Sequence, residues 1–134
     1  HGQVARVNGA RMRANAIEAA EQCGILTLPE IAAPVTLKEL IAHFDRDRLL
    51  VFCDEAAEVA DPVAALAAFR PPTPAPLPMA VLIGPEGGFA PAEREALMGL
   101  PRVVRLALGP RILRADTAAV AALALVQAVL GDWR

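Results

Sequence analysis

The stretch that decides the fold runs from residue 79 to residue 89: Met79-Ala80-Val81-Leu82-Ile83-Gly84-Pro85-Glu86-Gly87-Gly88-Phe89. Its five apolar residues end abruptly in a glycine-rich turn, and the following segment, Ala92 to Leu100, reads as a helix. A buried strand that turns through glycines into a helix commonly builds a ligand site at the carboxyl edge of a sheet. Glycine also lets the backbone approach a ligand closely. We therefore expect a strand followed by a ligand-binding loop.

The carboxylate of Glu86 argues against two familiar nucleotide-binding loops. A phosphate-binding loop of the form G-x-x-x-x-G-K-[ST] needs a lysine, and none follows here. The dinucleotide fingerprint G-x-G-x-x-G does not fit glycines at positions 84, 87 and 88. An acidic loop suits a ligand that is neutral or cationic near the glycines. An ordinary strand-to-helix turn with a surface glutamate remains the alternative.

A second segment of the same kind follows about twenty-five residues later, from Leu106 to Ala118, and it ends with the sequence L-G-P-R-I-L-R-A-D-T-A. The strand expected over Val103 to Leu108 again ends in Gly-Pro. A loop with Arg111 and Arg114 leads into a long Ala-rich helix from about Ala115 to Leu130, which Asp116 or Thr117 would cap. Solvated surface charge is the alternative for both arginines.

The rest of the chain alternates helices and strands, which predicts one α/β domain with a parallel sheet. Proline-rich residues 70–78 form a connector. The remaining expected elements are a helix over Ala10 to Gln22, a short strand over Leu28 to Ile31, a helix over Leu37 to Phe44 capped by Thr36, a strand over Arg48 to Cys53, and a helix from Asp61-Pro62 to Phe69.

Composition excludes several classes of protein. No apolar run approaches the roughly 18 residues of a membrane span, and no signal peptide is recognisable. The two cysteines fit neither a metal site nor a disulfide framework, so we expect no metal and a cytoplasmic setting. The net charge of −2 does not indicate a nucleic-acid-binding protein, since such domains are usually basic. Arginines, which favour phosphate contacts, nevertheless cluster near both ends of the chain: Arg6, Arg11, Arg13, Arg102, Arg105, Arg111 and Arg114.

The ordered pair I-G-P-E-G-G-F and L-G-P-R-I-L-R-A-D-T-A resembles the RsmE family of the SPOUT superfamily of methyltransferases. Residues 13–24, R-A-N-A-I-E-A-A-E-Q-C-G, are similar to a third family segment. The resemblance implies an S-adenosylmethionine-dependent enzyme that methylates N3 of a uridine in 16S ribosomal RNA of the small subunit. It also implies a carboxyl-terminal trefoil knot, helices on both faces of a mostly parallel sheet, and a homodimer.

Family members usually carry an amino-terminal PUA-like RNA-binding domain, which has no counterpart in residues 1–134. We therefore expect this chain to be a methyltransferase-domain fragment. A non-catalytic RNA-binding or dimerisation fragment is one alternative function. A nucleotide-binding α/β domain that uses the glycine loop for phosphate is another.

The resemblance also suggests roles for individual residues. Arg114 and Glu86 are candidate catalytic residues, because one could stabilise negative charge on the uridine and the other tolerates a cationic sulfonium. The expected RNA-binding residues are Arg11, Asn15, Glu18, Gln22 and Arg111. The expected cofactor-binding residues are Leu82, Ile83, Gly84, Pro85, Glu86, Gly87, Gly88, Phe89, Leu108, Gly109, Ile112 and Leu113. Methyl transfer from a sulfonium requires positioning and loss of the N3 proton, and it requires no metal.

Overall fold

The computed structural model describes residues 7–58 and 61–134, and its centre is a three-stranded parallel sheet. The strands are β1 (Leu49–Cys53), β2 (Met79–Ile83) and β3 (Val103–Leu106), in the order β2-β1-β3. Leu49 to Cys53 pair in register with Met79 to Ile83, and Leu50 to Cys53 pair with Val103 to Leu106. The α/β class and the parallel sheet are as the sequence predicts.

Five helices complete the described part of the chain: α1 (Gly9–Cys23), α2 (Leu37–Ala42), α3 (Pro62–Ala67), α4 (Pro91–Met98) and α5 (Ala115–Val129). Two expected caps are present, since the side chains of Thr36 and Asp61 accept hydrogen bonds from the backbone N–H groups of Glu39 and Ala64. Gly24 ends α1 in the left-handed conformation, with φ of 67°.

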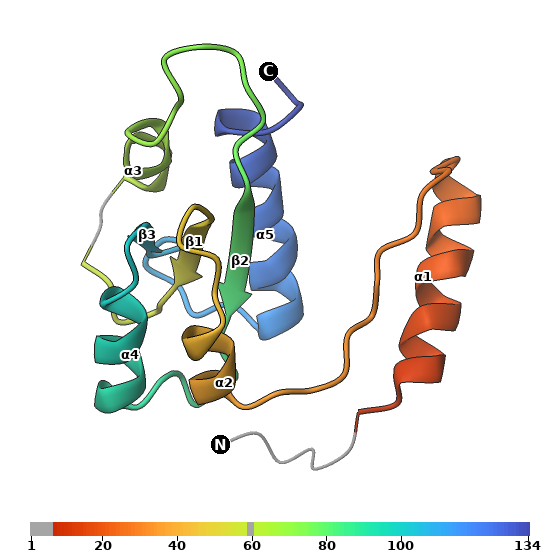
Figure 1. Cartoon of the computed structure of the whole chain (residues 1–134), viewed down its shortest axis with the longest axis horizontal. Helices are drawn as coiled ribbons and strands as arrows, with labels where there is room; N and C mark the ends of the chain where they lie inside the picture. The colour runs from red at the N-terminus through yellow and green to blue at the C-terminus, as the bar shows by residue number, and fades with distance from the viewer. Residues whose placement is uncertain (1–6, 59–60) are drawn as a thin grey trace.

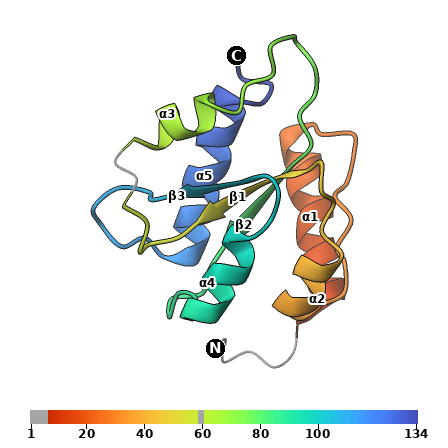
Figure 2. The same cartoon turned by 60° about the vertical axis from the view of Figure 1, so that its left-hand side comes forward.

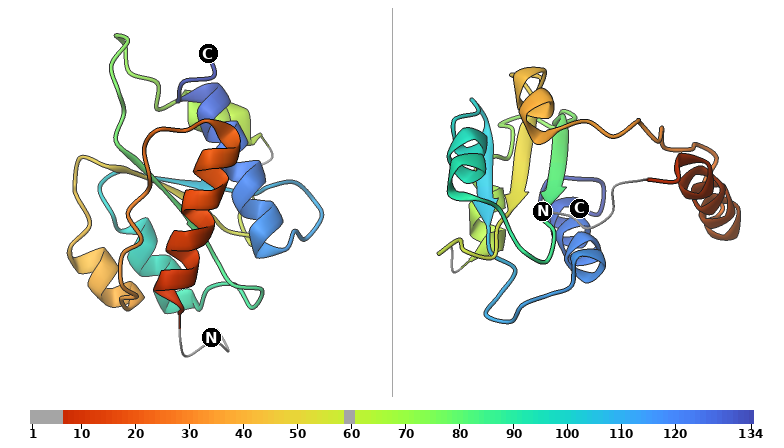
Figure 3. Two further views of the ribbon diagram at one scale, coloured as in Figure 1. Left: turned by 90° about the vertical axis from the view of Figure 1, so that its right-hand side faces the viewer. Right: turned by 90° about the horizontal axis from the view of Figure 1, so that it is seen from below.

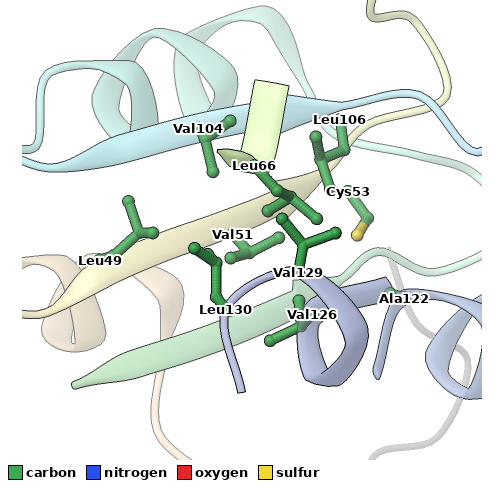
Figure 4. Close-up of a cluster of buried hydrophobic side chains, with 10 residues drawn as sticks. All are labelled: Leu49, Val51, Cys53, Leu66, Val104, Leu106, Ala122, Val126, Val129 and Leu130. Carbon is green, nitrogen blue, oxygen red and sulfur yellow. The ribbon is translucent and has the colours of Figure 1, made fainter. Parts of the chain in front are cut away.

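Alternate residues of β1 point to opposite faces of the sheet and build two separate cores. Leu49, Val51 and Cys53 face α3 and α5, where they pack with Leu66, Val126 and other side chains shown in Figure 4. Leu50 and Phe52 face α2 and α4 and pack with Leu97. Figure 2 shows the resulting three layers, with the sheet between the two pairs of helices. All five residues of β1 are buried, as a central parallel strand requires.

Two local expectations are wrong. Residues 28–31 form no strand, because within the described residues this segment pairs with no other strand. Neither Asp116 nor Thr117 caps α5: the cap position is Arg114, without a side-chain hydrogen bond. The carboxylate of Asp116 instead accepts a hydrogen bond from the backbone N–H of Thr117 inside the first turn. An acidic group in the first turn is stabilised by the positive end of the helix dipole.

Helix α1 stands apart from the sheet. Figures 1 and 3 show it at the end of an extended segment, residues 25–36, away from the other helices. Ala20 is its only buried residue, whereas Met12 and the following Ile25 and Leu26 are exposed, Leu26 to 99%.

Candidate ligand-binding pocket

A pocket lies at the carboxyl edge of the sheet, where the loops that follow all three strands converge. Residues 53–55 follow β1, residues 83–89 include the glycine loop after β2, and residues 106–115 lead from β3 into α5. The chain passes from β1 to one neighbour and later returns to the other, so the pocket lies at a topological switch point. Its volume of about 230 Å³ suits an organic ligand and is much larger than a few waters need.

The glycine loop begins with a tight turn. The backbone N–H of Gly88 donates to the carbonyl of Pro85 at 2.9 Å, and Gly88 has φ of 69°. Gly84 is required for another reason: a Cβ there would lie 2.5 Å from Cε2 of Phe89. The Phe89 ring in turn packs edge to face against buried Phe52, with ring centroids 4.7 Å apart. The loop is therefore folded back onto the core by an aromatic contact that only glycine at 84 permits.

The second loop supplies apolar walls and a cationic rim. Leu108 and Leu113 are half-buried in the pocket lining, and Gly109 takes φ of 88° where the chain turns after β3. Arg111 and Arg114 lie at the exposed rim. Arg114 Nε is 3.7 Å from a carboxylate oxygen of Asp116, but both side chains are more than three-quarters exposed. Such an exposed pair contributes little stability, so Arg114 is free to meet a ligand.

Asp54 lies directly after β1 and forms the polar floor of the pocket, with its side chain fully buried. One carboxylate oxygen accepts from Nε of Arg94 and Nε of Arg105, both at 2.7 Å. The other accepts from a second nitrogen of Arg94 at 3.2 Å and from the backbone N–H of Ala56 at 3.1 Å. Arg94 comes from α4 and Arg105 from β3. A buried carboxylate persists only when paired and hydrogen-bonded in this way.

Two ionisable groups of the lining have shifted pKa values. Burial alone would raise the pKa of Asp54, but the hydrogen bonds from Arg94, Ala56 and Arg105 outweigh it and hold that pKa below its ordinary value. Burial raises the pKa of the Cys53 thiol to about 11. Cys53 is therefore protonated near neutral pH and is no nucleophile. Asp54 is ionised, and its carboxylate is occupied by hydrogen bonds from Arg94 and Arg105.

Most of the residues expected to contact a cofactor lie in the pocket lining. Leu82 and Gly87 do not. Leu82 points to the opposite face of the sheet and packs against the Leu50–Phe52 core, because side chains alternate along a strand. Gly87 is at the exposed outside of the turn. The ten that line the pocket are Ile83, Gly84, Pro85, Glu86, Gly88, Phe89, Leu108, Gly109, Ile112 and Leu113.

The candidate catalytic and RNA-binding residues fall into two groups. Glu86, Arg111 and Arg114 lie together at the pocket. The other four, Arg11, Asn15, Glu18 and Gln22, are exposed on α1, and none of them lines the pocket. Their spacing of four, three and four residues places them on one face of the helix. Within one chain, the structure does not bring this face to the pocket.

Two arginines of the clusters seen in the sequence make contacts inside the fold and are not available to a ligand. Arg105 forms a hydrogen-bonded ion pair with Asp54, and Arg102 donates a hydrogen bond to the backbone carbonyl of Asp47 at 3.0 Å. Both have roles within the fold. Arg6 lies outside the described residues.

Sequence reasoning did not single out Asp54, Arg94 or Arg105 as a unit. The one signal was an acidic residue directly after a buried strand, since a charge at that position is commonly at a sheet's ligand-binding edge. The helical pattern of residues 92–100 does not indicate that Arg94 forms an ion pair with Asp54. In the described ranges 7–58 and 61–134, no three His, Cys, Asp or Glu side chains cluster as metal ligands do. No helix within those ranges is long and apolar enough to cross a membrane.

The fold and the pocket define an α/β domain with a candidate ligand-binding pocket at the carboxyl ends of its parallel strands. The family model described as the RNA methyltransferase domain matches residues 2–127. The chain therefore belongs to the RNA methyltransferase domain family.

Known proteins of similar sequence and structure agree with this family. The ribosomal RNA small subunit methyltransferase E of Rickettsia conorii is 30% identical over 125 residues, which are 93% of this chain and 49% of that protein. A putative methyltransferase from Legionella pneumophila, solved with its bound cofactor SAM, has 33% identity and a TM-score of 0.72 over 97% of this chain and 52% of its own.

The ribosomal RNA small subunit methyltransferase E from Neisseria gonorrhoeae, solved bound to S-adenosyl methionine, has 25% identity and a TM-score of 0.77. That match covers 99% of this chain and 54% of the Neisseria chain. The chain thus spans about half the length of these relatives.

Proposed function

We propose that this domain binds S-adenosylmethionine in the pocket at the carboxyl edge of the sheet and methylates N3 of a uridine in small-subunit ribosomal RNA. The observation that carries the proposal is the convergence of the glycine loop and the second loop on one pocket, in a chain of the RNA methyltransferase domain family. Two similar proteins of known structure hold this cofactor.

The chemistry of the lining fits the cofactor. Ile83, Leu108 and Leu113 offer apolar walls for an adenine ring, and the glycine loop exposes backbone groups that can hydrogen-bond its edge. Glu55 and Glu86 place carboxylates at the pocket, where they favour a cationic sulfonium.

Bound S-adenosylmethionine would supply the methyl group on its sulfonium. The protein's own contribution is to hold the uridine in line with that group and to favour loss of the N3 proton. Arg111 and Arg114, at the rim, are placed to stabilise negative charge on the uridine carbonyl oxygens or to bind a phosphate. Glu86 at the same rim would favour the cationic sulfonium of a bound cofactor. These are roles in positioning and electrostatics, for which no metal is needed.

We also propose that the active unit is a homodimer, with α1 and α5 at its interface. Val120 and Leu123 on α5 are 72% and 51% exposed, and Met12 on α1 is 46% exposed. These apolar side chains support the proposal because a partner's surface would cover them. Light scattering on the purified chain tests it: twice the monomer mass is expected, and a monomer at all concentrations would overturn it.

The wider setting is proposed from the resemblance. The carboxyl-terminal segment would pass through an earlier loop to form the SPOUT trefoil knot, and the protein would work in the cytoplasm on the small ribosomal subunit. An additional PUA-like domain would supply most of the RNA affinity. This chain alone would bind RNA weakly, with an affinity that falls steeply as salt rises, because phosphate contacts release counterions. Fusing a PUA-like domain should strengthen binding and methylation. Equal methylation by chain and fusion would contradict this view.

Calorimetric titration separates the three candidate functions. We expect S-adenosylmethionine and its demethylated product to bind with one site per chain, and ATP and NAD not to bind. Binding of ATP or NAD alone would instead support a nucleotide-binding domain. Binding of RNA with no response to any cofactor would support a non-catalytic fragment. Transfer of a labelled methyl group to small-subunit RNA, mapped to uridine N3, tests the reaction itself.

A further inference from the structure

The network around Asp54 joins all three segments that build the pocket. Asp54 begins the segment after β1. Arg94 is in the first turns of α4, the helix that immediately follows the glycine loop, and Arg105 is one residue before the end of β3, where the second loop begins. Each pocket loop is therefore attached, within a few residues, to one buried carboxylate.

From this arrangement we infer that Asp54 is a positioning residue, which holds the glycine loop and the second loop at the separation that the cofactor requires. The inference rests on the proposed function, because that function supplies the ligand. Asp54 acts through its two arginines and is not itself available to the ligand: its carboxylate already accepts from Arg94, Arg105 and the N–H of Ala56.

The balance of charge makes the network sensitive to Asp54. Two guanidinium groups converge on one carboxylate, and their side chains are only 25% and 29% exposed. Without the negative charge the two cations would repel each other across a partly dry space, where repulsion is weakly screened. Since one arginine belongs to α4 and the other to β3, that repulsion would push apart the two loops that face each other across the pocket.

Glu55 adds a second link between these segments. Its carboxylate lies 2.8 Å from the position of a Cβ on Gly88, at the end of the glycine turn, and its charge also acts on Arg94. The segment after β1 therefore meets the glycine loop at both ends, through Glu55 at the turn and through Arg94 at the helix. Asp54 is next to Glu55 in the chain and holds Arg94 through two hydrogen bonds.

The sheet contains a matched control. At its amino edge Arg102, directly before β3, ties the same strand to the backbone carbonyl of Asp47 with a hydrogen bond of 3.0 Å. That tether resembles the one made by Arg105 in residue type and strand, but it lies at the edge away from the pocket. We expect its loss to affect stability without reaching the pocket loops.

The experiment compares the full chain with the variants Asp54→Asn, Arg94→Gln, Arg105→Gln, the double variant Asp54→Asn/Arg94→Gln, and the control Arg102→Gln. Amide hydrogen exchange is measured without ligand, and binding of S-adenosylhomocysteine is measured by calorimetry. Both are done well below each melting temperature. If Asp54→Asn does not fold, Arg94→Lys replaces it, since lysine keeps the charge and loses the two-pronged contact.

We expect Asp54→Asn to speed exchange in residues 84–90 and 106–114 and to raise the dissociation constant about tenfold, a typical size for coupling between linked sites. Arg94→Gln should have a smaller effect in the Asp54→Asn background than in the wild type, because the two residues share one network. Arg102→Gln should leave loop exchange and affinity unchanged.

The inference is overturned if Asp54→Asn lowers the melting temperature but leaves loop exchange and affinity at wild-type values. It is also overturned if Arg102→Gln changes them as much. A wild-type chain that binds no S-adenosylhomocysteine would refute the proposed function instead, and the exchange measurement would still decide whether Asp54 holds the loops.

Discussion

Replacing Gly84 by alanine tests how the glycine loop is attached to the core. The new Cβ would lie 2.5, 3.0 and 3.2 Å from three carbon atoms of the Phe89 ring, where ordinary contacts begin near 3.4 Å. The ring must therefore move by about 1 Å. It cannot move freely, because it packs edge to face against Phe52, which is completely buried between the sheet and α4.

The cost of this change can be estimated from two sources. Overpacking a core by a methyl group typically costs about 1–3 kcal/mol, and loss of the aromatic pair would add roughly 0.5–1.5 kcal/mol. For a domain of this size we expect a fall of about 5–15 °C in melting temperature. Because Phe89 also lines the pocket, affinity for S-adenosylhomocysteine should fall as well, by about tenfold if the ring leaves its place.

Gly87→Ala is the matched control. It lies three residues away in the same loop, has no positive φ, and a Cβ there meets nothing within 4 Å. Thermal unfolding followed by circular dichroism, and calorimetry with S-adenosylhomocysteine, should show Gly87→Ala close to wild type. The reasoning fails if Gly84→Ala matches wild type in both measurements, or if the two variants are equally impaired.

Three further outcomes are expected. Gly88→Val should weaken cofactor binding in calorimetry, because its φ of 69° disfavours a branched side chain and its Cβ would press on Glu55; unchanged affinity would contradict this. Arg114→Ala should lower the single-turnover methylation rate about 10²–10³-fold and leave cofactor affinity nearly intact. Arg114→Lys should recover part of the rate. An unchanged rate in Arg114→Ala would show that Arg114 is not part of the active site. The stability advantage of wild type over Asp54→Asn, measured by urea unfolding, should be complete above about pH 4 and disappear as the pH falls below it, because the pKa of Asp54 is lower in the folded state than its ordinary value of 3.8. A difference that does not change with pH would mean that the pKa of Asp54 is the same in the folded and the unfolded protein.

The elements of the sheet could be predicted from sequence because their signals are local. Met79 to Ile83 is a short apolar run bounded by proline and glycine, and the structure has β2 over those same residues. Thr36 and Asp61 are strong cap residues, and each begins the helix expected of it. The glycine-rich turns also predicted the position of the pocket, because a buried strand that turns through glycines into a helix commonly builds a ligand site at the edge of a sheet.

What could not be predicted depends on contacts that are distant in sequence. Asp54 is 40 residues from Arg94 and 51 from Arg105, so no window of sequence contains the network. Leu28 to Ile31 has an apolar residue at each end but contains Pro29 and Glu30, which disfavour a strand, and among the described residues the segment has no neighbouring strand to pair with. The position of α1 could not be predicted either, since the pattern of the helix fixes only which of its side chains share a face.

A titration of the isotopically labelled chain with S-adenosylmethionine, followed by amide NMR, tests the central claim most directly. We predict shifts confined to the amides of Ile83 to Phe89, the segment after β1, and Leu106 to Leu113, with little change on the far side of the sheet at the groove between α2 and α4. Saturation at one ligand per chain with that pattern is the expected result. No shifts at millimolar ligand, or shifts centred on the α2–α4 groove, would contradict the assignment of the pocket and with it the proposed reaction.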